Sequence, residues 1–113
     1  MDMSDKKDIL CVSNAYQKKY YLNDTFQELP KSIKEDLQVL CVLYTEDIGG
    51  ILTLYFDEDG NLEFETTYEE GDFFYDEIGS VLKIKQYRNE KRELFEALEL
   101  YYKVRVLGEN PNV

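Results

Sequence analysis

The feature that most constrains the fold is a pair of alternating apolar and polar segments joined by a short polar turn. Residues 51–57 and 62–67 both show the alternation of a strand with one buried face. The turn between them reads D-E-D-G-N, and its Asp59-Gly60 pair supplies the positive φ that a tight hairpin needs. The sequence therefore predicts an antiparallel hairpin at this point.

The same alternation assigns the two faces of this hairpin. Apolar side chains expected to face the core alternate along both segments: Leu52, Leu54, Phe56, Leu62 and Phe64. Glu63 and Glu65 point from the opposite face of the second strand. We therefore expect that side of the sheet to face water.

A second hairpin and a helix are predicted before this one. The apolar run 9–13 and the tyrosine-rich run 18–22 are separated by few residues around Asn14, which favours a hairpin. After Pro30, which suits the first turn of a helix, apolar residues recur at helical spacing. They are Ile33, Leu37, Leu40, Cys41 and Tyr44.

This helix leaves one ambiguity. Residues 39–44 are apolar on nearly all sides, which predicts deep burial if they are helical. The same six residues also favour a strand, so both states remain open. Gly49 and Gly50 end the element, because glycine accepts the left-handed conformation found at helix ends.

The stretch from about 76 to 104 lacks proline and has only Gly79 against a helix. Its apolar residues form two clusters whose directions differ by roughly 150° around the helix axis. The first contains Ile78, Val81 and Leu82, and the second contains Leu94, Phe95, Leu98, Tyr101 and Tyr102. The polar residues 88–93 separate the clusters, so either the helix breaks there or its two halves pack on different bodies.

Together these elements predict an α+β domain in the order ββαββα. Helices should cover one face of an antiparallel sheet, and a long helix should end the domain. At 113 residues we expect a single domain over residues 9–108. A flexible N-terminal tail at 1–8 and a C-terminal tail at 109–113 should flank it.

Charge is distributed very unevenly along this chain. Residues 35–82 carry 14 Asp and Glu and no Lys or Arg, and the net charge of −11 is concentrated there. A dense acidic block repels nucleic acid and anionic membranes, and it attracts cations or basic proteins. We therefore expect no nucleic-acid partner and no membrane partner, with a basic protein as one candidate.

No arrangement of residues specifies a reaction. The absence of His excludes Ser-His and Cys-His nucleophilic pairs and His-based metal sites. Cys11 and Cys41 lie in apolar runs and are interpreted as small buried hydrophobic residues. A disulfide between them is the alternative, disfavoured because no signal peptide precedes Cys11. We predict no catalytic residues, no cofactor and a cytoplasmic location.

The turn at residues 57–61 has the clustered carboxylates that calcium prefers. However, Gly60 is fourth from Asp57, whereas an EF-hand loop has its glycine at the sixth position. Asp and Asn are also ordinary turn residues, through hydrogen bonds to their own backbone. A plain hairpin turn is therefore the favoured interpretation, and we predict no metal site.

The final helix predicts self-association as a two-fold dimer. Its first apolar cluster can complete the core, so the second cluster would otherwise be an exposed apolar patch. The interface candidates are Leu94, Phe95, Leu98, Tyr101 and Tyr102. The alternative is a break within 88–93 that folds this segment back onto its own domain.

Adjacent aromatic residues are the remaining feature. They occur at Tyr20-Tyr21, Phe73-Phe74-Tyr75 and Tyr101-Tyr102. Because neighbours along a strand or helix cannot all face one core, part of each group should lie at its edge. Half-exposed core edges and a tyrosine-rich protein interface both remain open.

Three segments carry a resemblance to a known family. They are residues 40–62, LCVLYTEDIGGILTLYFDEDGNL; residues 75–80, YDEIGS; and residues 98–104, LELYYKV. They resemble a family of small acidic proteins of unknown function found mainly in anaerobic Gram-positive bacteria. The resemblance implies a single cytoplasmic domain over about 11–108 and brings no functional residue with it.

Two functional hypotheses follow. The leading one is a non-catalytic protein–protein interaction or scaffold module, because catalytic constellations are missing and the acidic block has a single sign. The alternative is a small-molecule or cation binder, or an enzyme that uses carboxylates only. A deep pocket in which two or more acids converge would favour the enzyme.

Overall fold

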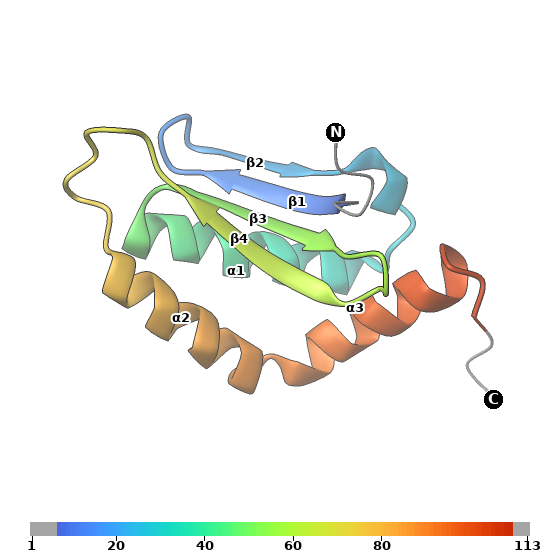
Figure 1. Cartoon of the computed structure of the whole chain (residues 1–113). Helices are drawn as coiled ribbons and strands as arrows, with labels where there is room; N and C mark the ends of the chain where they lie inside the picture. The colour runs from blue at the N-terminus through green and yellow to red at the C-terminus, as the bar shows by residue number, and fades with distance from the viewer. Residues whose placement is uncertain (1–6, 110–113) are drawn as a thin grey trace.

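The computed structural model describes residues 7–109 as a four-stranded antiparallel sheet with helices packed on one face (Figure 1). The strands are β1 (Asp8–Asn14), β2 (Lys19–Leu22), β3 (Ile51–Phe56) and β4 (Leu62–Thr67). Their order is β2-β1-β3-β4, and both predicted hairpins, β1–β2 and β3–β4, are confirmed. The two hairpins are joined in one sheet because β1 pairs with β3 at its centre.

The helical elements are η1 (Asp24–Phe26), α1 (Lys31–Ile48), α2 (Glu77–Glu90) and α3 (Arg92–Arg105). The α+β class and the order ββαββα are confirmed, with the final helical stretch divided at Lys91. The predicted tails, 1–8 and 109–113, lie mostly outside the described residues. Asp8, assigned to the N-terminal tail, already belongs to β1.

The central strand β1 has an irregularity that increases what it buries. The register with β3 shifts between Ile9 and Cys11, so Leu10 is an extra residue on β1. Such a bulge turns two successive side chains toward the same side of a sheet. Leu10 and Cys11 are accordingly both fully buried, which simple alternation along the strand does not predict.

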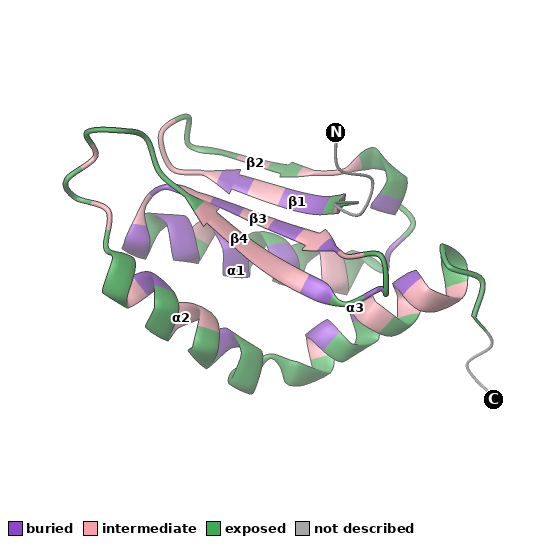
Figure 2. Ribbon diagram, viewed as in Figure 1, coloured by how far each residue is buried: buried purple, intermediate pink, exposed green. Residues whose placement is uncertain are grey.

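Helix α1 covers the buried face of the sheet and presents Leu37, Leu40, Cys41 and Tyr44 to the core (Figure 2). Residues 39–44 are helical, which settles the ambiguity between helix and strand. The prediction that they are buried on all sides is wrong, because Val39 and Leu43 are 59% and 49% exposed. One side of α1 packs on the sheet and a flank meets α2, so these two side chains remain open to solvent.

The β3–β4 hairpin has its predicted faces. Leu52, Leu54, Phe56 and Leu62 are buried, whereas Phe64 is only partly buried against the core. Phe64 lies on the edge strand, where the ring of Phe95 meets it edge-on at 5.2 Å between centroids. Glu63 and Glu65 lie on the opposite face, and Tyr21 of β2 is exposed there as well.

The packing of the two C-terminal apolar clusters is the reverse of the prediction. Ile78, Val81 and Leu82 were expected to complete the core, yet all three are exposed on α2. Most of the second cluster is instead buried on α3. The break at Lys91 lies within the predicted polar stretch 88–93 and turns α3 back onto its own domain (Figure 1).

Candidate interaction surface on helix α2

The start of α2 is anchored by one of three consecutive aromatic residues. Tyr75 packs against the core, and its ring stacks on Tyr68 with 4.4 Å between centroids. It lies over Gly50, where an added Cβ would be 2.6 Å from both the Tyr75 ring and the carbonyl oxygen of Thr67. The absence of a side chain at Gly50 therefore lets the loop before α2 dock against the end of α1.

Next to the contact between Tyr75 and Gly50, the hydroxyl groups of Tyr44, Tyr75 and Ser80 join α2 to α1. The Tyr44 hydroxyl lies 2.6 Å from the Ser80 hydroxyl and 3.1 Å from that of Tyr75, and the Tyr75 and Ser80 oxygens are 3.1 Å apart. Burial raises the pKa of Tyr44 above its usual value, although the hydrogen bond with Ser80 partly opposes this rise. The cluster satisfies polar groups that would be costly to bury alone.

Further along, α2 meets α1 through mixed polar and apolar contacts. The hydroxyl of Tyr87, which is buried, donates a hydrogen bond to the carbonyl oxygen of Leu40 over 3.3 Å. Lys83 pairs with Asp47 at 3.0 Å, and Ile84 packs against the core. The inner face of α2 is thus narrow and partly polar, and only Ser80 and Tyr87 are buried on this helix.

The opposite side of α2 and the loop before it carry exposed apolar side chains. The exposed fractions are 93% for Phe73, 96% for Phe74, 76% for Ile78, 67% for Val81 and 61% for Leu82. Residues 78, 81 and 82 lie on one face of the helix by their spacing. We call these five residues the α2 apolar surface, and Figure 2 shows the exposed outer side of α2.

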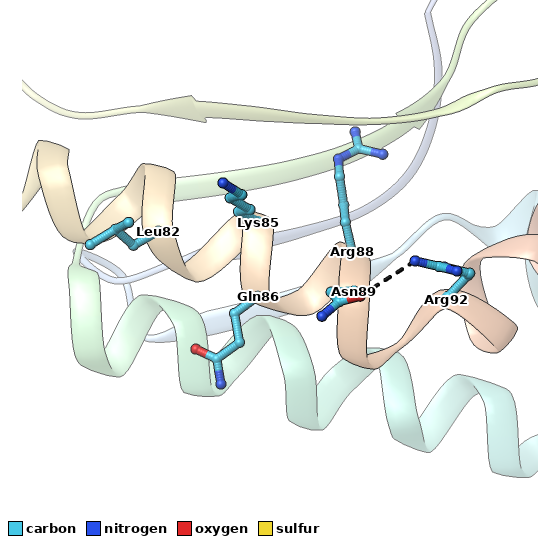
Figure 3. Close-up of a pocket in the computed structure, with 6 residues that line it drawn as sticks. All are labelled: Leu82, Lys85, Gln86, Arg88, Asn89 and Arg92. Atoms are coloured by element: carbon cyan, nitrogen blue, oxygen red, sulfur yellow. Dashed lines mark hydrogen bonds between the residues drawn. The ribbon is translucent and has the colours of Figure 1, made fainter.

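A basic groove continues from this surface toward the break at Lys91. It is a shallow, open depression with a volume of about 510 Å³. Figure 3 shows the residues that line it: Leu82, Lys85, Gln86, Arg88, Asn89 and Arg92. Arg92 donates to Asn89 over 3.3 Å, while Arg88 turns toward β4 and lies 4.7 Å from the centroid of the Phe64 ring. Three cationic residues therefore line this groove, which has Leu82 at the end nearer the α2 apolar surface.

The net charge changes from negative to positive along residues 69–92. Residues 69–77 contain five acids and no base, and residues 83–92 contain five bases and one acid. Among the described residues, two of those bases form ion pairs within the chain, Lys83 with Asp47 and Arg88 with Glu63. The helical residues of the α2 apolar surface, Ile78, Val81 and Leu82, thus lie between an acidic and a basic end.

The predicted interface residues lie elsewhere and mostly inside the domain. Phe95, Leu98 and Tyr102 of α3 are buried, whereas Leu94 and Tyr101 are partly buried against the same core. The argument that this cluster would be left exposed is therefore wrong. Its partner is the end of the sheet, which the sequence does not identify as such.

Specific contacts hold α3 on that end of the sheet. Tyr102 stacks on Phe56 with 4.2 Å between ring centroids, and its hydroxyl donates to Asp8 over 2.8 Å. Burial, followed by that hydrogen bond, raises the pKa of Tyr102 to about 12. A carboxylate oxygen of Glu99 accepts a hydrogen bond from the Leu62 backbone N–H over 2.7 Å.

In the acidic turn at residues 57–61, the carboxylate oxygens of Asp57 accept hydrogen bonds from other residues of the turn. One carboxylate oxygen of Asp57 accepts from the N–H groups of Asp59 and Asn61, each over 2.9 Å. Slight burial of Asp57 raises its pKa, but the hydrogen bonds from the turn outweigh this and lower the pKa overall. Within residues 7–109, no group of three or more His, Cys, Asp or Glu is placed to hold a metal ion.

The two cysteines meet although the sequence separates them. Cys11 of β1 and Cys41 of α1 are both buried free thiols, as predicted, and their sulfur atoms lie 3.8 Å apart. The hydrogen bond with Cys11, followed by burial, raises the pKa of Cys41 well above its usual value. The thiolate needed for reactivity is therefore disfavoured.

A further concavity of about 510 Å³ lies between the β1–β2 hairpin and α1. Its lining includes Lys18, Lys19, Gln38 and a single acid, Glu46. The convergence of two or more acids that the enzyme hypothesis named is therefore not found in this lining. The acidic block itself is spread over α1, the turn before β4, β4 and the loop before α2.

Comparison with known proteins places the chain in a family without assigning it an activity. The profile of a family of unknown function (DUF6145) matches residues 7–110, so the chain belongs to that family. No curated protein and no solved structure matches it. Among residues 7–109, no helix is both long and apolar enough to cross a membrane.

Proposed function

For this member of a family of unknown function, we propose a non-catalytic protein–protein interaction module whose binding surface is the outer side of α2. The observation that carries the proposal is the α2 apolar surface, in which five large apolar side chains are exposed within ten residues. Exposed apolar patches rimmed by charge are typical of protein interaction sites. A cytoplasmic location forms part of the proposal, supported by two buried free thiols in contact.

The organisation of α2 supports this role in a second way. The helix is held to the domain by Tyr75, Ser80 and Tyr87, all on or near its inner side. The apolar residues on its outer side are therefore not needed for this attachment. Their exposure is compatible with a stably placed helix that offers Ile78, Val81 and Leu82 to a partner.

The test is affinity capture from native lysate with three versions of the protein: wild type, Leu82→Glu and Leu100→Glu. Leu100 is the matched control, because it is an exposed leucine of α3 at 53% exposure. We expect the captured protein to be recovered with wild type and Leu100→Glu and lost with Leu82→Glu. Equal recovery with all three versions would contradict the proposed surface.

A further inference from the structure

We propose that the α2 apolar surface binds a second copy of this chain, with the two α2 helices antiparallel about a two-fold axis near Val81. This inference rests on the proposed function and names its partner. It also moves the expected dimer interface from α3, whose large apolar residues are mostly inside the domain, to α2. The argument depends on charge, spacing and the position of the exposed side chains.

Charge complementarity selects a second copy in the antiparallel direction. The acidic end of the segment contains Glu69, Glu70, Asp72, Asp76 and Glu77, and the basic end contains Lys83, Lys85, Arg88, Lys91 and Arg92. Antiparallel helices bring the acidic end of each copy over the basic end of the other. Parallel helices would bring like charges together, which costs binding energy.

Several of these charges are available for such pairing. Among residues 7–109, Lys85, Lys91 and Arg92 form no ion pair, and neither do the five acids of residues 69–77. Glu77 accepts a hydrogen bond from the Tyr68 hydroxyl and Asp76 accepts one from the Gly79 N–H, but neither has a cationic partner in the described part of the chain. Pairing across a two-fold interface would therefore supply the opposite charges that the single chain does not. It would also reduce the repulsion between two chains that each carry a net charge of −11.

The spacing along α2 agrees with an axis near Val81. Glu77 is four residues before Val81 and Lys85 is four residues after it, so both lie about 6 Å along the helix from the axis at 1.5 Å per residue. Each Lys85 then lies opposite Glu77 of the second copy. In the same register, Ile78 of each copy lies opposite the stretch between Leu82 and Lys85 of the other.

The exposed aromatic residues extend the same interface. Phe73 and Phe74 lie eight and seven residues before Val81, and the residues that line the basic groove lie one to eleven residues after it. Both residues precede the first turn of α2, and the antiparallel arrangement brings this end of the helix next to Lys85, Asn89 and Arg92 of the second copy. Aromatic rings against cationic side chains are favourable contacts. The apolar surface and the groove are thereby covered together.

Sedimentation equilibrium of the full chain at tens of micromolar is the first test. We expect a dimer for wild type and for the control Leu100→Glu, and a monomer for Leu82→Glu. A wild-type monomer, or a dimer that persists in Leu82→Glu, would overturn the inference. Circular dichroism of each variant establishes that its helices are retained.

Charge reversal tests the direction and register without changing an apolar residue. Glu77→Lys and Lys85→Glu should each raise the dimer Kd by about tenfold, which corresponds to one lost charge contact per half of the interface. The two changes combined in one chain should restore the affinity, because each restores the opposite charge across the axis. Loss without restoration in the double variant would contradict this register.

Cross-linking locates the axis directly. Val81→Cys should form a disulfide between two copies under mild oxidation, whereas Leu100→Cys should not. The native thiols are buried and do not compete. A monomeric wild type that still loses its lysate partner in Leu82→Glu would overturn this inference and leave the proposed function standing.

Discussion

Helices α2 and α3 have the same length of 14 residues and adjoin at Lys91, yet they serve the domain differently. Helix α3 buries Phe95, Leu98 and Tyr102 against the sheet, whereas α2 buries only Ser80 and Tyr87. Three of the four large aliphatic residues of α2, Ile78, Val81 and Leu82, face outward, and only Ile84 packs against the core. The comparison shows that apolar content alone does not decide which part of a helical stretch forms the core.

The difference has an energetic meaning. Each large apolar side chain buried on α3 contributes about 1.5–3 kcal/mol to folding relative to its exposure. Helix α2 depends more on hydroxyl hydrogen bonds, whose net contributions are about 0.5–1.5 kcal/mol each. We therefore expect α3 to be part of the most stable region and α2 to open at a lower free energy.

The largest expected effect is a contrast between one leucine from each helix. Leu98→Ala should lower the free energy of unfolding by about 2–5 kcal/mol, because Leu98 is fully buried and its truncation leaves a cavity. Leu82→Ala should change it by less than about 0.5 kcal/mol at a concentration too low for self-association, because that side chain is exposed in the single chain. Urea denaturation of the two variants at equal concentration measures both values. A larger loss in Leu82→Ala would reverse the comparison.

The next effect concerns the hydroxyl cluster that holds α2. Tyr44→Phe removes the oxygen shared with Ser80 and Tyr75, and we expect a loss of about 1–2 kcal/mol. The same measurement on Tyr21→Phe is the control, because Tyr21 is on the open face of the sheet and exposed. Amide hydrogen exchange should show the added opening first in α2. Uniform acceleration over α3 as well would indicate that the two helices open together.

A smaller effect is expected from alkaline pH at the attachment of α3. The pKa of Tyr102 is raised to about 12 by burial and by its hydrogen bond to Asp8. The folded state therefore holds this proton more tightly than the unfolded state, and the resulting stability is fully present below pH 10, the ordinary tyrosine value. It should be lost as the pH rises from about 10 to 12.

The measurement is the free energy of unfolding as a function of pH in wild type and Tyr102→Phe. Other tyrosines with raised pKa values, such as Tyr44, contribute to the wild-type slope. Removing the Tyr102 proton site should make the decline above pH 10 shallower. An identical slope in the two proteins would exclude Tyr102 as a contributor.

The smallest expected effect is that of calcium on the β3–β4 turn. The oxygens of Asp57 are engaged by the turn itself, so millimolar calcium should leave the thermal midpoint nearly unchanged. A ligand that binds only the native state must raise that midpoint. A saturable shift of several degrees that disappears in Asp59→Asn would show that the turn binds calcium.

Much of the fold could be predicted because its evidence is local. The alternation at Leu52, Leu54 and Phe56, the turn glycine Gly60 and the start of α1 after Pro30 all depend on near neighbours in the chain. The position of the α2–α3 break was also within the predicted polar stretch. These features are determined by backbone conformations and by the periods of helix and strand.

The candidate surface could not be predicted in the same way. Ile78, Val81 and Leu82 were expected in the core because they cluster in one direction around the helix axis, but Ser80, Ile84 and Tyr87 form its inner side. A hydroxyl can replace a methyl group in a core when a partner such as Tyr44 lies opposite. The change from acidic to basic residues between 69 and 92 was visible in the sequence and could have indicated this segment.

By itself, the sequence determined the two hairpins, their turns and the two ends of α1, because these depend on interactions between residues close in the chain. It left open whether residues 39–44 are helical and whether the final helix breaks within residues 88–93. Only the tertiary structure decided that Cys11 meets Cys41, that Leu10 is buried at a bulge, and that α3 rather than the outer side of α2 completes the core. Burial depends on which surface lies opposite a side chain. That surface comes from distant parts of the chain, here the end of the sheet at Phe56 and the flank of α1 at Tyr44.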